Sequence, residues 1–412
     1  MRLPIFLTSL ALAAAIAAPL SAQLGLPGVQ VPRIGEVLDP VTGEVLDGLE
    51  NTTQGVTRQA LRLANLRERR IDQLVRRNSD VIEFDVQGAP ARRGELLLMD
   101  ADAAGIAAAE AQGFSVIGTE QIDGLGLSVT RLQVPADTDL AEAQEQLSEL
   151  LPDAEISADN LHFSSGKGAV LPAMMQRAAS SISAPIGMID GGVSGTAKVT
   201  AQKGFASGAP ASSSHGNSVA YLLRYAGADN IRVADVYGAD RAGGNALAIV
   251  KAIDWLIASG SKVINISLVG PRNTLMEKAV ARAQSKGAVI VAAVGNDGPA
   301  APPAYPASYD GVVAVTAVDK RNRALIEAGR PLHLDYAAPG ADIYARDING
   351  KAHKLRGTSF ASPLAAARIA ASLERGQGWR KAIDSEARDL GKKGPDAVYG
   401  RGLLCDKCRP AK

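Results

Sequence analysis

Residues 261–296 have the sequence SKVINISLVGPRNTLMEKAVARAQSKGAVIVAAVGN, in which two apolar runs flank a helical pattern. The run VIVAAV is apolar throughout, and VINISL is apolar apart from Asn265 and Ser267, as expected of strands that helices cover on both faces. Apolar strands that alternate with helices indicate an α/β fold, a mainly parallel sheet with helices on both faces. In such a sheet we expect functional side chains at the carboxyl ends of strands.

The same alternation continues on both sides of this stretch. Further apolar and helical runs follow one another along the chain: PIGMID (185–190), NSVAYLLRYAG (217–227), IRVADVYG (231–238), ALAIVKAIDWLIASG (246–260) and GVVAVTAVD (311–319). The pattern predicts one α/β domain over residues 164–412, opening with a segment rich in Ser, Gly and Ala.

A smaller unit is predicted before this domain. Strand-like and helical segments alternate in it: GELLLMDA (94–101), DAAGIAAAEAQGF (102–114), LGLSVTRLQVP (125–135), DLAEAQEQLSELL (139–151) and AEISADNLHF (154–163). Thr138 or Asp139 can cap the second helix, and Pro152 ends it. Two strand–helix–strand halves within residues 81–163 predict a small α+β, ferredoxin-like domain.

The N-terminus has the pattern of an export signal. One arginine precedes a short apolar run that ends in small residues, which predicts a secretory signal peptide over residues 1–22. The alternative is a membrane anchor, for which the run is short. No later stretch is long and apolar enough to form a stable membrane span, so we expect a secreted or periplasmic protein.

Residues 23–80 are predicted to be a linker that ends in a basic helix. Seven arginines lie between Arg58 and Arg77, against Glu68 and Asp72. This segment could contact an acidic partner or lipid head groups, although a solvated helix face is the simpler interpretation. The whole chain is almost neutral, with 44 Lys and Arg against 43 Asp and Glu, so we expect no nucleic-acid partner.

The two cysteines, Cys405 and Cys408, form the sequence CDKC near the C-terminus. In an oxidising compartment they are candidates for a local disulfide, and a redox pair is the alternative. No Asp-rich cluster resembles a calcium site, and too few ligands surround the cysteines for zinc. We therefore expect no metal and no cofactor.

Four polar residues lie at strand ends or helix starts, where α/β folds commonly carry functional side chains. Asp190 ends an apolar strand, and His215 lies in SSSHGNS at the start of a predicted helix. Ser359 lies in GTSFASP, just before an Ala-rich helix whose N-terminus favours an oxyanion. Asn296 directly follows a buried strand and can donate to a developing negative charge. Each alone could be a turn or capping residue, but the run GTSxASP is specific.

Together these residues resemble the subtilisin-like serine proteases, over about residues 165–404. Members of this family have the same order of acid, base and nucleophile along the chain. The resemblance implies that Ser359 is the nucleophile, His215 the general base and Asp190 its orienting acid. It also implies that Asn296 and the Ser359 backbone N–H form an oxyanion hole. Protein or peptide substrates are the implied partners.

The resemblance extends to the substrate groove. Ser267, Leu268 and Val269 match the family's substrate-pairing strand, to which an extended peptide adds as a further strand. Val269 and Val294 stand where smaller residues are usual, which implies a narrow pocket and small or medium apolar side chains before the cut. Three other departures, at Gly191, Ser218 and Leu364, replace no member of the triad.

The unit at residues 81–163 resembles the family's inhibitory propeptide. This likeness implies a zymogen that binds its own propeptide domain and cuts itself between about Asn160 and Gly168, where flexible Ser and Gly residues would let the new end leave. A catalytically silent relative that only binds a partner is the main alternative function. An esterase with the same triad is disfavoured because no GxSxG motif surrounds Ser359.

Overall fold

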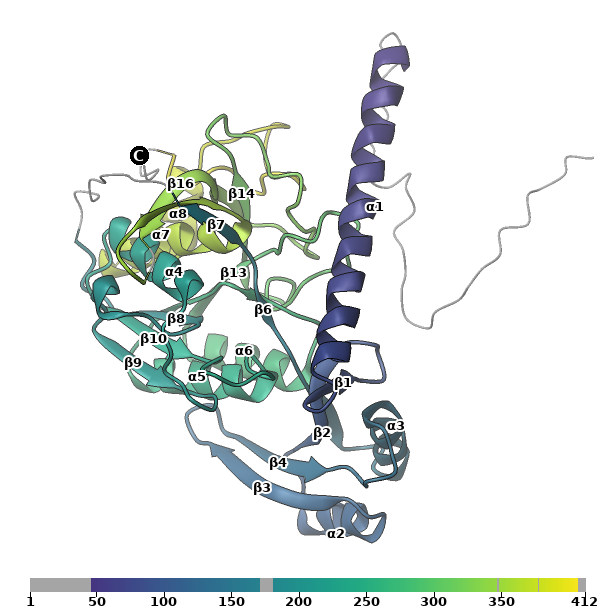
Figure 1. Ribbon diagram of the computed structural model, residues 1–412. Coiled ribbons are helices and arrows are strands. Elements are labelled where there is room, and N and C mark those ends of the chain that lie inside the picture. Colours follow the sequence, from purple (N-terminus) through teal and green to yellow (C-terminus); the bar gives the residue numbers. More distant parts are fainter. Residues whose placement is uncertain (1–45, 171–180, 347, 377, 407–412) are drawn as a thin grey trace, which may run out of the picture. The chain divides into compact units, whose positions relative to one another are not determined.

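The computed structural model describes residues 46–170, 181–346, 348–376 and 378–406 (Figure 1). The predicted signal peptide lies outside these residues. Among the helices in the described ranges, none is long and apolar enough to cross a lipid bilayer.

The main sheet has seven parallel strands in the order β15-β14-β13-β11-β8-β10-β9. In chain order they are β8 (Ile186–Asp190), β9 (Ala201–Gly204), β10 (Ile231–Asp235), β11 (Val263–Ile266), β13 (Val289–Ala293), β14 (Val313–Val318) and β15 (Tyr336–Pro339). Every residue of β8, β11, β13 and β14 is buried. The predicted mainly parallel α/β fold is confirmed.

Helices bury both faces of this sheet. One face packs against α4 (Ser214–Tyr225) and α7 (Ser362–Glu374), and the other against α5 (Ala246–Ala258) and α6 (Thr274–Ser285). Successive strand residues point to opposite faces. Within β13, for example, Val291 therefore belongs to one core and Ile290 to the other. A short helix, α8 (Trp379–Glu386), packs against α7.

The smaller unit has an antiparallel sheet and two helices. Its elements are β1 (Ile82–Phe84), β2 (Pro90–Met99), α2 (Ala103–Ala111), β3 (Ser115–Ile122), β4 (Leu127–Gln133), α3 (Leu140–Leu150) and β5 (Glu155–Asn160). The order β3-β4-β2-β5, with β1 also beside β2, is the split arrangement of a ferredoxin-like unit. Of the two expected caps for α3, Asp139 accepts from the Glu142 N–H at 2.9 Å.

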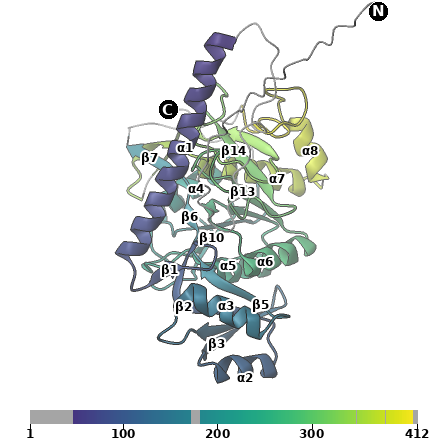
Figure 2. The same cartoon turned by 90° about the vertical axis from the view of Figure 1, so that its right-hand side faces the viewer.

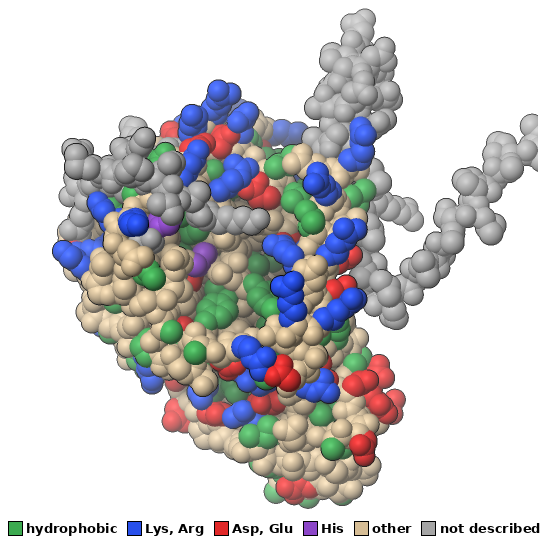
Figure 3. Space-filling model, in the orientation of Figure 1, with side chains coloured by type: hydrophobic (Ala, Val, Ile, Leu, Met, Phe, Trp, Pro, Cys, Tyr) green, Lys and Arg blue, Asp and Glu red, His purple; other side chains and the backbone are tan. Residues whose placement is uncertain are grey.

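The segment predicted to be a linker is, from Leu46 to Arg77, one continuous helix, α1, of 32 residues (Figures 1 and 2). Its inner face pairs Arg67 and Arg70 with Asp297 of the α/β part, the first at 3.5 Å. The other arginines of this helix are exposed, and Figure 3 shows blue side chains along it, which are arginines because the helix has no lysine. The helix therefore has the solvated face that the sequence predicted, and it also has two arginines that contact the α/β part.

Residues 163–170 connect the two units without a free separator. β6 (Phe163–Ser164) pairs antiparallel with β12 (Leu268–Val269) of the α/β part. β7 (Lys167–Val170) pairs with β17 (Ala352–Arg356), which also pairs with β16 (Ala341–Arg346). Within the Ser- and Gly-rich segment that was expected to be flexible, Lys167–Val170 form a strand, because their backbone groups complete a sheet.

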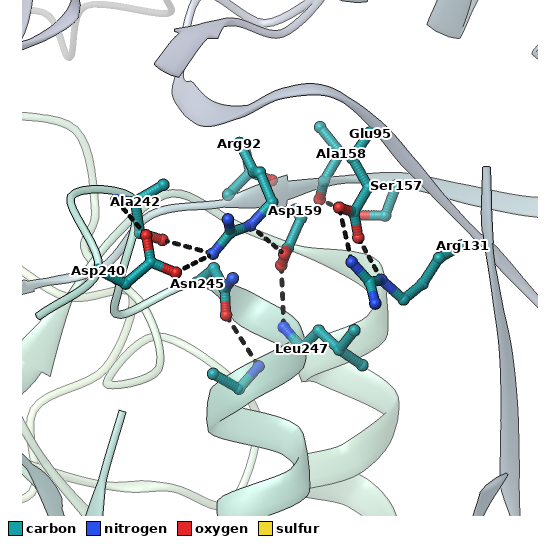
Figure 4. Close-up of polar contacts among 12 residues, drawn as sticks. Arg92, Glu95, Arg131, Ser157, Ala158, Asp159, Asp240, Ala242, Asn245 and Leu247 are labelled. Atoms are coloured by element: carbon teal, nitrogen blue, oxygen red, sulfur yellow. Dashed lines mark hydrogen bonds and ion pairs between the residues drawn. The ribbon is translucent and has the colours of Figure 1, made fainter. Parts of the chain in front are cut away.

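Polar contacts join the smaller unit to α5 and to the loop before it (Figure 4). Arg92 on β2 pairs with Asp240 at 2.7 Å, and Asp159 on β5 accepts from the Leu247 N–H at 2.9 Å. Burial raises the pKa of Asp159 to about 7, and the neighbouring Glu95 carboxylate adds to this rise. The N-cap of α6, Asn273, donates to the Ala158 carbonyl, the Ser157 hydroxyl and the Asn160 side chain.

Candidate active site

Asp190, His215 and Ser359, far apart in the sequence, form one hydrogen-bonded row. Asp190 is the last residue of β8, His215 is the second residue of α4, and Ser359 lies in the 3₁₀ turn Thr358–Phe360 before α7. His215 Nδ1 lies 2.9 Å from both oxygens of Asp190, and its Nε2 lies 3.0 Å from Ser359 Oγ. An acid, an imidazole and a hydroxyl in this order can activate the hydroxyl as a nucleophile.

Local sequence explains this placement. Ser213 caps α4 by accepting from the Gly216 N–H at 2.9 Å, so the helix starts with His215 facing β8. A Cβ at Gly216 would collide with the carbonyl of Gly191, which explains the glycine in HGN. Gly191 lacks a hydroxyl, but its backbone N–H donates to Asp190 Oδ1 at 2.7 Å. The carboxylate therefore still receives a hydrogen bond from this position.

The other two departures from the family pattern have structural roles. Ser218 Oγ donates to the Ser214 carbonyl, one turn earlier in α4, at 2.8 Å. Leu364 is fully buried in the core on the α4–α7 face of the sheet. Neither side chain is part of the hydrogen-bonded row.

Asn296 presents an unused donor beside Ser359. Its Oδ1 accepts from the Thr358 N–H at 3.0 Å, which fixes the amide plane. Its Nδ2 is buried and has no hydrogen-bond partner among the described residues. A buried unpaired donor is costly, and such groups commonly mark functional sites. This is the arrangement needed to stabilise an oxyanion that forms only during a reaction.

The chain's own residues 163–166 lie across this site. The Ser165 N–H donates to the Ser267 carbonyl at 3.4 Å, and the Ser165 carbonyl accepts from the Ser359 N–H at 3.2 Å. The same carbonyl contacts Ser359 Oγ. A Cβ on Gly357 would lie 3.0 Å from the Ser165 oxygen and 3.1 Å from Asn296 Nδ2, so only glycine allows both groups to approach here.

The expected groove residues take different positions. Ser267 Oγ donates to the Ser359 carbonyl at 2.9 Å and so holds the turn that carries the hydroxyl. Leu268 and Val294 are buried in the core on the α5–α6 face. Val269 is 9% exposed, and its side chain would lie 3.5 Å from a Cβ on Gly295, beside Asn296.

Sequence reasoning missed the groove wall opposite β12. The His162 N–H donates to the Gly244 carbonyl at 2.8 Å, and the Tyr237 hydroxyl donates to the His162 carbonyl at 2.7 Å. The His162 ring packs where a Cβ on Gly270 would be, and burial lowers the pKa of His162 to about 4. No local motif marks these residues, because loop folding alone brings them together.

Two expectations concern ligands and the C-terminus. Within the described ranges, no group of three or more His, Cys, Asp or Glu side chains could hold a metal ion. Cys405 is buried, but Cys408 lies outside the described residues, so the Cys405–Cys408 disulfide stays a prediction.

The sequence profile of the subtilase family, peptidase family S8, matches residues 193–402, which include His215, Asn296 and Ser359. The chain belongs to the subtilase family. Subtilisin DY of Bacillus licheniformis is 36% identical over 166 residues, which are 38% of this chain and 60% of that protein. The thermophilic serine proteinase of Bacillus sp. (strain AK1) is 37% identical over 179 residues, 42% of this subtilase and 44% of the relative. This subtilase therefore spans less than two thirds of the length of these relatives.

Solved structures share the fold of this subtilase. Fervidolysin from Fervidobacterium pennivorans, a keratinolytic enzyme related to subtilisin, superposes with a TM-score of 0.64 at 18% identity, over 77% of this chain and 61% of that one. The epidermin leader peptide processing serine protease of Staphylococcus aureus gives a TM-score of 0.57 at 16% identity, over 77% and 97%.

Proposed function

We propose that this subtilase is a serine endopeptidase that hydrolyses peptide bonds through an acyl-enzyme on Ser359. The observation that carries the proposal is the row Asp190–His215–Ser359, with separations of 2.9 and 3.0 Å. Family membership supports it, since curated relatives are named as subtilisins and serine proteinases.

The residues divide the reaction between them. His215 Nε2 takes the hydroxyl proton as Ser359 Oγ attacks the carbonyl carbon, and Asp190 stabilises the imidazolium. The Ser359 N–H and Asn296 Nδ2 hold the oxyanion of the tetrahedral intermediate. The C–N bond then breaks, His215 gives its proton to the leaving amine, and water hydrolyses the ester by the same route in reverse.

The first substrate is the chain itself, and the bond cut is Ser165–Gly166. The Ser165 carbonyl contacts both the nucleophile and one donor of the oxyanion hole, as the carbonyl of a bound substrate would. This bond lies inside the window Asn160–Gly168 expected from the sequence. Attack within one molecule is effectively unimolecular, so self-cleavage should not depend on protein concentration.

The propeptide then comprises the residues before Gly166, α1 included, and it covers the cleft after cleavage. Side chains of α1 (Ile71, Leu74 and Val75) belong to one apolar cluster with Leu161, Phe163 and Ala242. Ala242 belongs to the peptidase part, and Phe163 belongs to the segment that lies across the candidate active site. The helix α1 therefore covers this segment from outside. Arg67 and Arg70 attach the helix next to Asn296, through Asp297.

Export completes the proposal. The pattern of residues 1–22 supports a cleaved signal peptide, and one curated relative is named a minor extracellular protease of Bacillus subtilis. The peptidase would then act on proteins in the periplasm or outside the cell.

Two measurements on the native protein and on Ser359→Ala test this function. A fluorophosphonate probe should label the native protein once the propeptide has left, and Ser359→Ala should stay unlabelled. The native protein should also resolve into two fragments, the larger beginning at Gly166 by N-terminal sequencing, while Ser359→Ala remains one chain. A native protein that is neither labelled nor cut would favour the silent, partner-binding relative instead.

A further inference from the structure

Residues 162–165, here called the cleft strand, are bound along both of their edges. Phe163 and Ser165 face β12, through the register Val269–Phe163 and the hydrogen bond from the Ser165 N–H to the Ser267 carbonyl. Alternate residues of a strand present their backbone groups to opposite edges, so His162 and Ser164 face the other wall. On that wall, Gly244 accepts from the His162 N–H, and among the described residues no backbone hydrogen bond continues this pairing toward Ser164.

A tyrosine takes the place of that missing strand residue. The Tyr237 hydroxyl donates to the His162 carbonyl at 2.7 Å. The hydroxyl therefore donates to an acceptor on the free edge of the strand, as a pairing strand would.

The tyrosine is held in position by peptidase residues alone. Its N–H donates to Asp235 Oδ1 at 2.9 Å, and its carbonyl accepts from the Asp240 N–H at 3.1 Å. A Cβ on Gly244 would collide with the phenol ring, so this glycine admits the ring to the groove. Burial, then the nearby Asp190 carboxylate, raises the pKa of Tyr237 well above its usual value, which keeps the hydroxyl protonated as a donor.

We propose that Tyr237 is a substrate-binding residue whose hydroxyl holds the backbone carbonyl of the fourth residue before the cut. The proposal rests on the proposed function, because residues 162–165 represent a substrate only if Ser165–Gly166 is the bond cut. The contact is to a backbone atom, so Tyr237 should act on peptides of any sequence that reach four residues before the cut. It selects length and extended conformation rather than side chains.

The test compares Tyr237→Phe with the native processed enzyme on two acyl-capped p-nitroanilides, His-Phe-Ser-Ser and Ser-Ser. The shorter substrate lacks the carbonyl at the fourth residue before the cut. A lost neutral hydrogen bond should lower kcat/KM on the longer substrate by about 3- to 10-fold, mainly through KM, and on the shorter one by clearly less. An equal loss on both substrates, or no loss, would overturn the proposal.

A second measurement separates this proposal from the proposed function. In uncleaved Ser359→Ala protein, Tyr237→Phe should shift the carbonyl ¹³C resonance of His162 upfield, as the loss of a hydrogen bond to a carbonyl does, whereas Tyr344→Phe, which removes the same atom from β16, should not. If the native enzyme shows no Ser359-dependent hydrolysis, the proposed function fails and the carbonyl resonance decides the role of Tyr237. An unchanged His162 carbonyl resonance would contradict that role.

Discussion

The segment in the cleft is held by different kinds of contact at its two ends. At Ser165 the contacts are short and polar, and they come from groups that can also move a proton or stabilise an oxyanion. Around Leu161 and Phe163 the contacts are apolar packing, with α1 on the outside. Substitutions at the first end should therefore change the rate of the chemical step, and those at the second the time for which the propeptide occupies the cleft.

The largest effect is expected at the Ser165 end, in Asn296→Ala. This change removes the proposed oxyanion donor, Nδ2, which has no hydrogen-bond partner among the described residues, so kcat should fall by about 10²- to 10³-fold while KM stays nearly constant. Steady-state kinetics of the processed enzyme measure both constants.

Asn296→Asp is the comparison variant, because it keeps an acceptor for the Thr358 N–H while it removes the donor and adds a negative charge beside the oxyanion. It should lose at least as much activity as Asn296→Ala. If Asn296→Asp kept most of the turnover, Asn296 would act by holding Thr358, and the comparison between the two ends would lose its basis.

The two ends also differ in what the sequence could reveal. The proposed catalytic residues lie in short local patterns, such as GTSxASP before a helix, because a nucleophile at a helix N-terminus needs particular neighbours. The parallel sheet was predictable for a similar reason, since burial on both faces requires apolar strands.

Tyr237, Asp297 and Gly244 carry no such pattern. Their roles arise because loops meet residues more than 70 positions away, and a loop tyrosine or aspartate has no sequence pattern that predicts such a contact. The sequence predicted that α1 is helical, but it could not predict the ion pairs with Asp297. Which two of the seven arginines make these pairs depends on tertiary packing.

The middle of the cleft gives the next largest effect. Val269 lies beside Gly295 and Asn296, so its side chain should limit the pocket for the residue before the cut. Val269→Gly should raise the ratio of kcat/KM for Phe over Ala at that position by about 10- to 100-fold, and Val269→Ala by less. Profiling with a peptide library measures the ratio, and an unchanged preference in both variants would place the specificity elsewhere.

The far end should respond to pH through two opposed groups. The pKa of Asp159 is raised from 3.8 to about 7, so ionising this buried carboxyl costs stability as pH rises from about 4 to 7. The pKa of His162 is lowered from 6.5 to about 4, so protonation favours the unfolded state as pH falls from about 6.5 to 4. Between these limits the two effects oppose each other, and uncleaved Ser359→Ala protein should show little net dependence.

Removing one group at a time should reveal the other. In the Ser359→Ala background, Asp159→Asn should lose stability on acidification, and His162→Phe should lose it as pH rises, each by about tenfold per pH unit in the folding equilibrium. Urea unfolding between pH 4 and 7.5 measures this, with Ser359→Ala as the reference. Parallel curves for the three proteins would show that neither group titrates as its surroundings imply.

The smallest effect is expected from the ion pairs between α1 and Asp297. Arg67 and Arg70 both pair with Asp297, but Arg70 is 59% exposed and exposed ion pairs contribute little. The double variant Arg67→Ala/Arg70→Ala should therefore shorten the lifetime of the inhibited, already cleaved complex only about 2- to 10-fold, without changing kcat of the released enzyme. Arg62→Ala/Arg69→Ala removes the same charge from the exposed face and should leave the lifetime unchanged. The delay between self-cleavage and the appearance of activity reports this lifetime, and equal delays in the two double variants would mean that net charge, rather than the contact at Asp297, holds α1 over the cleft.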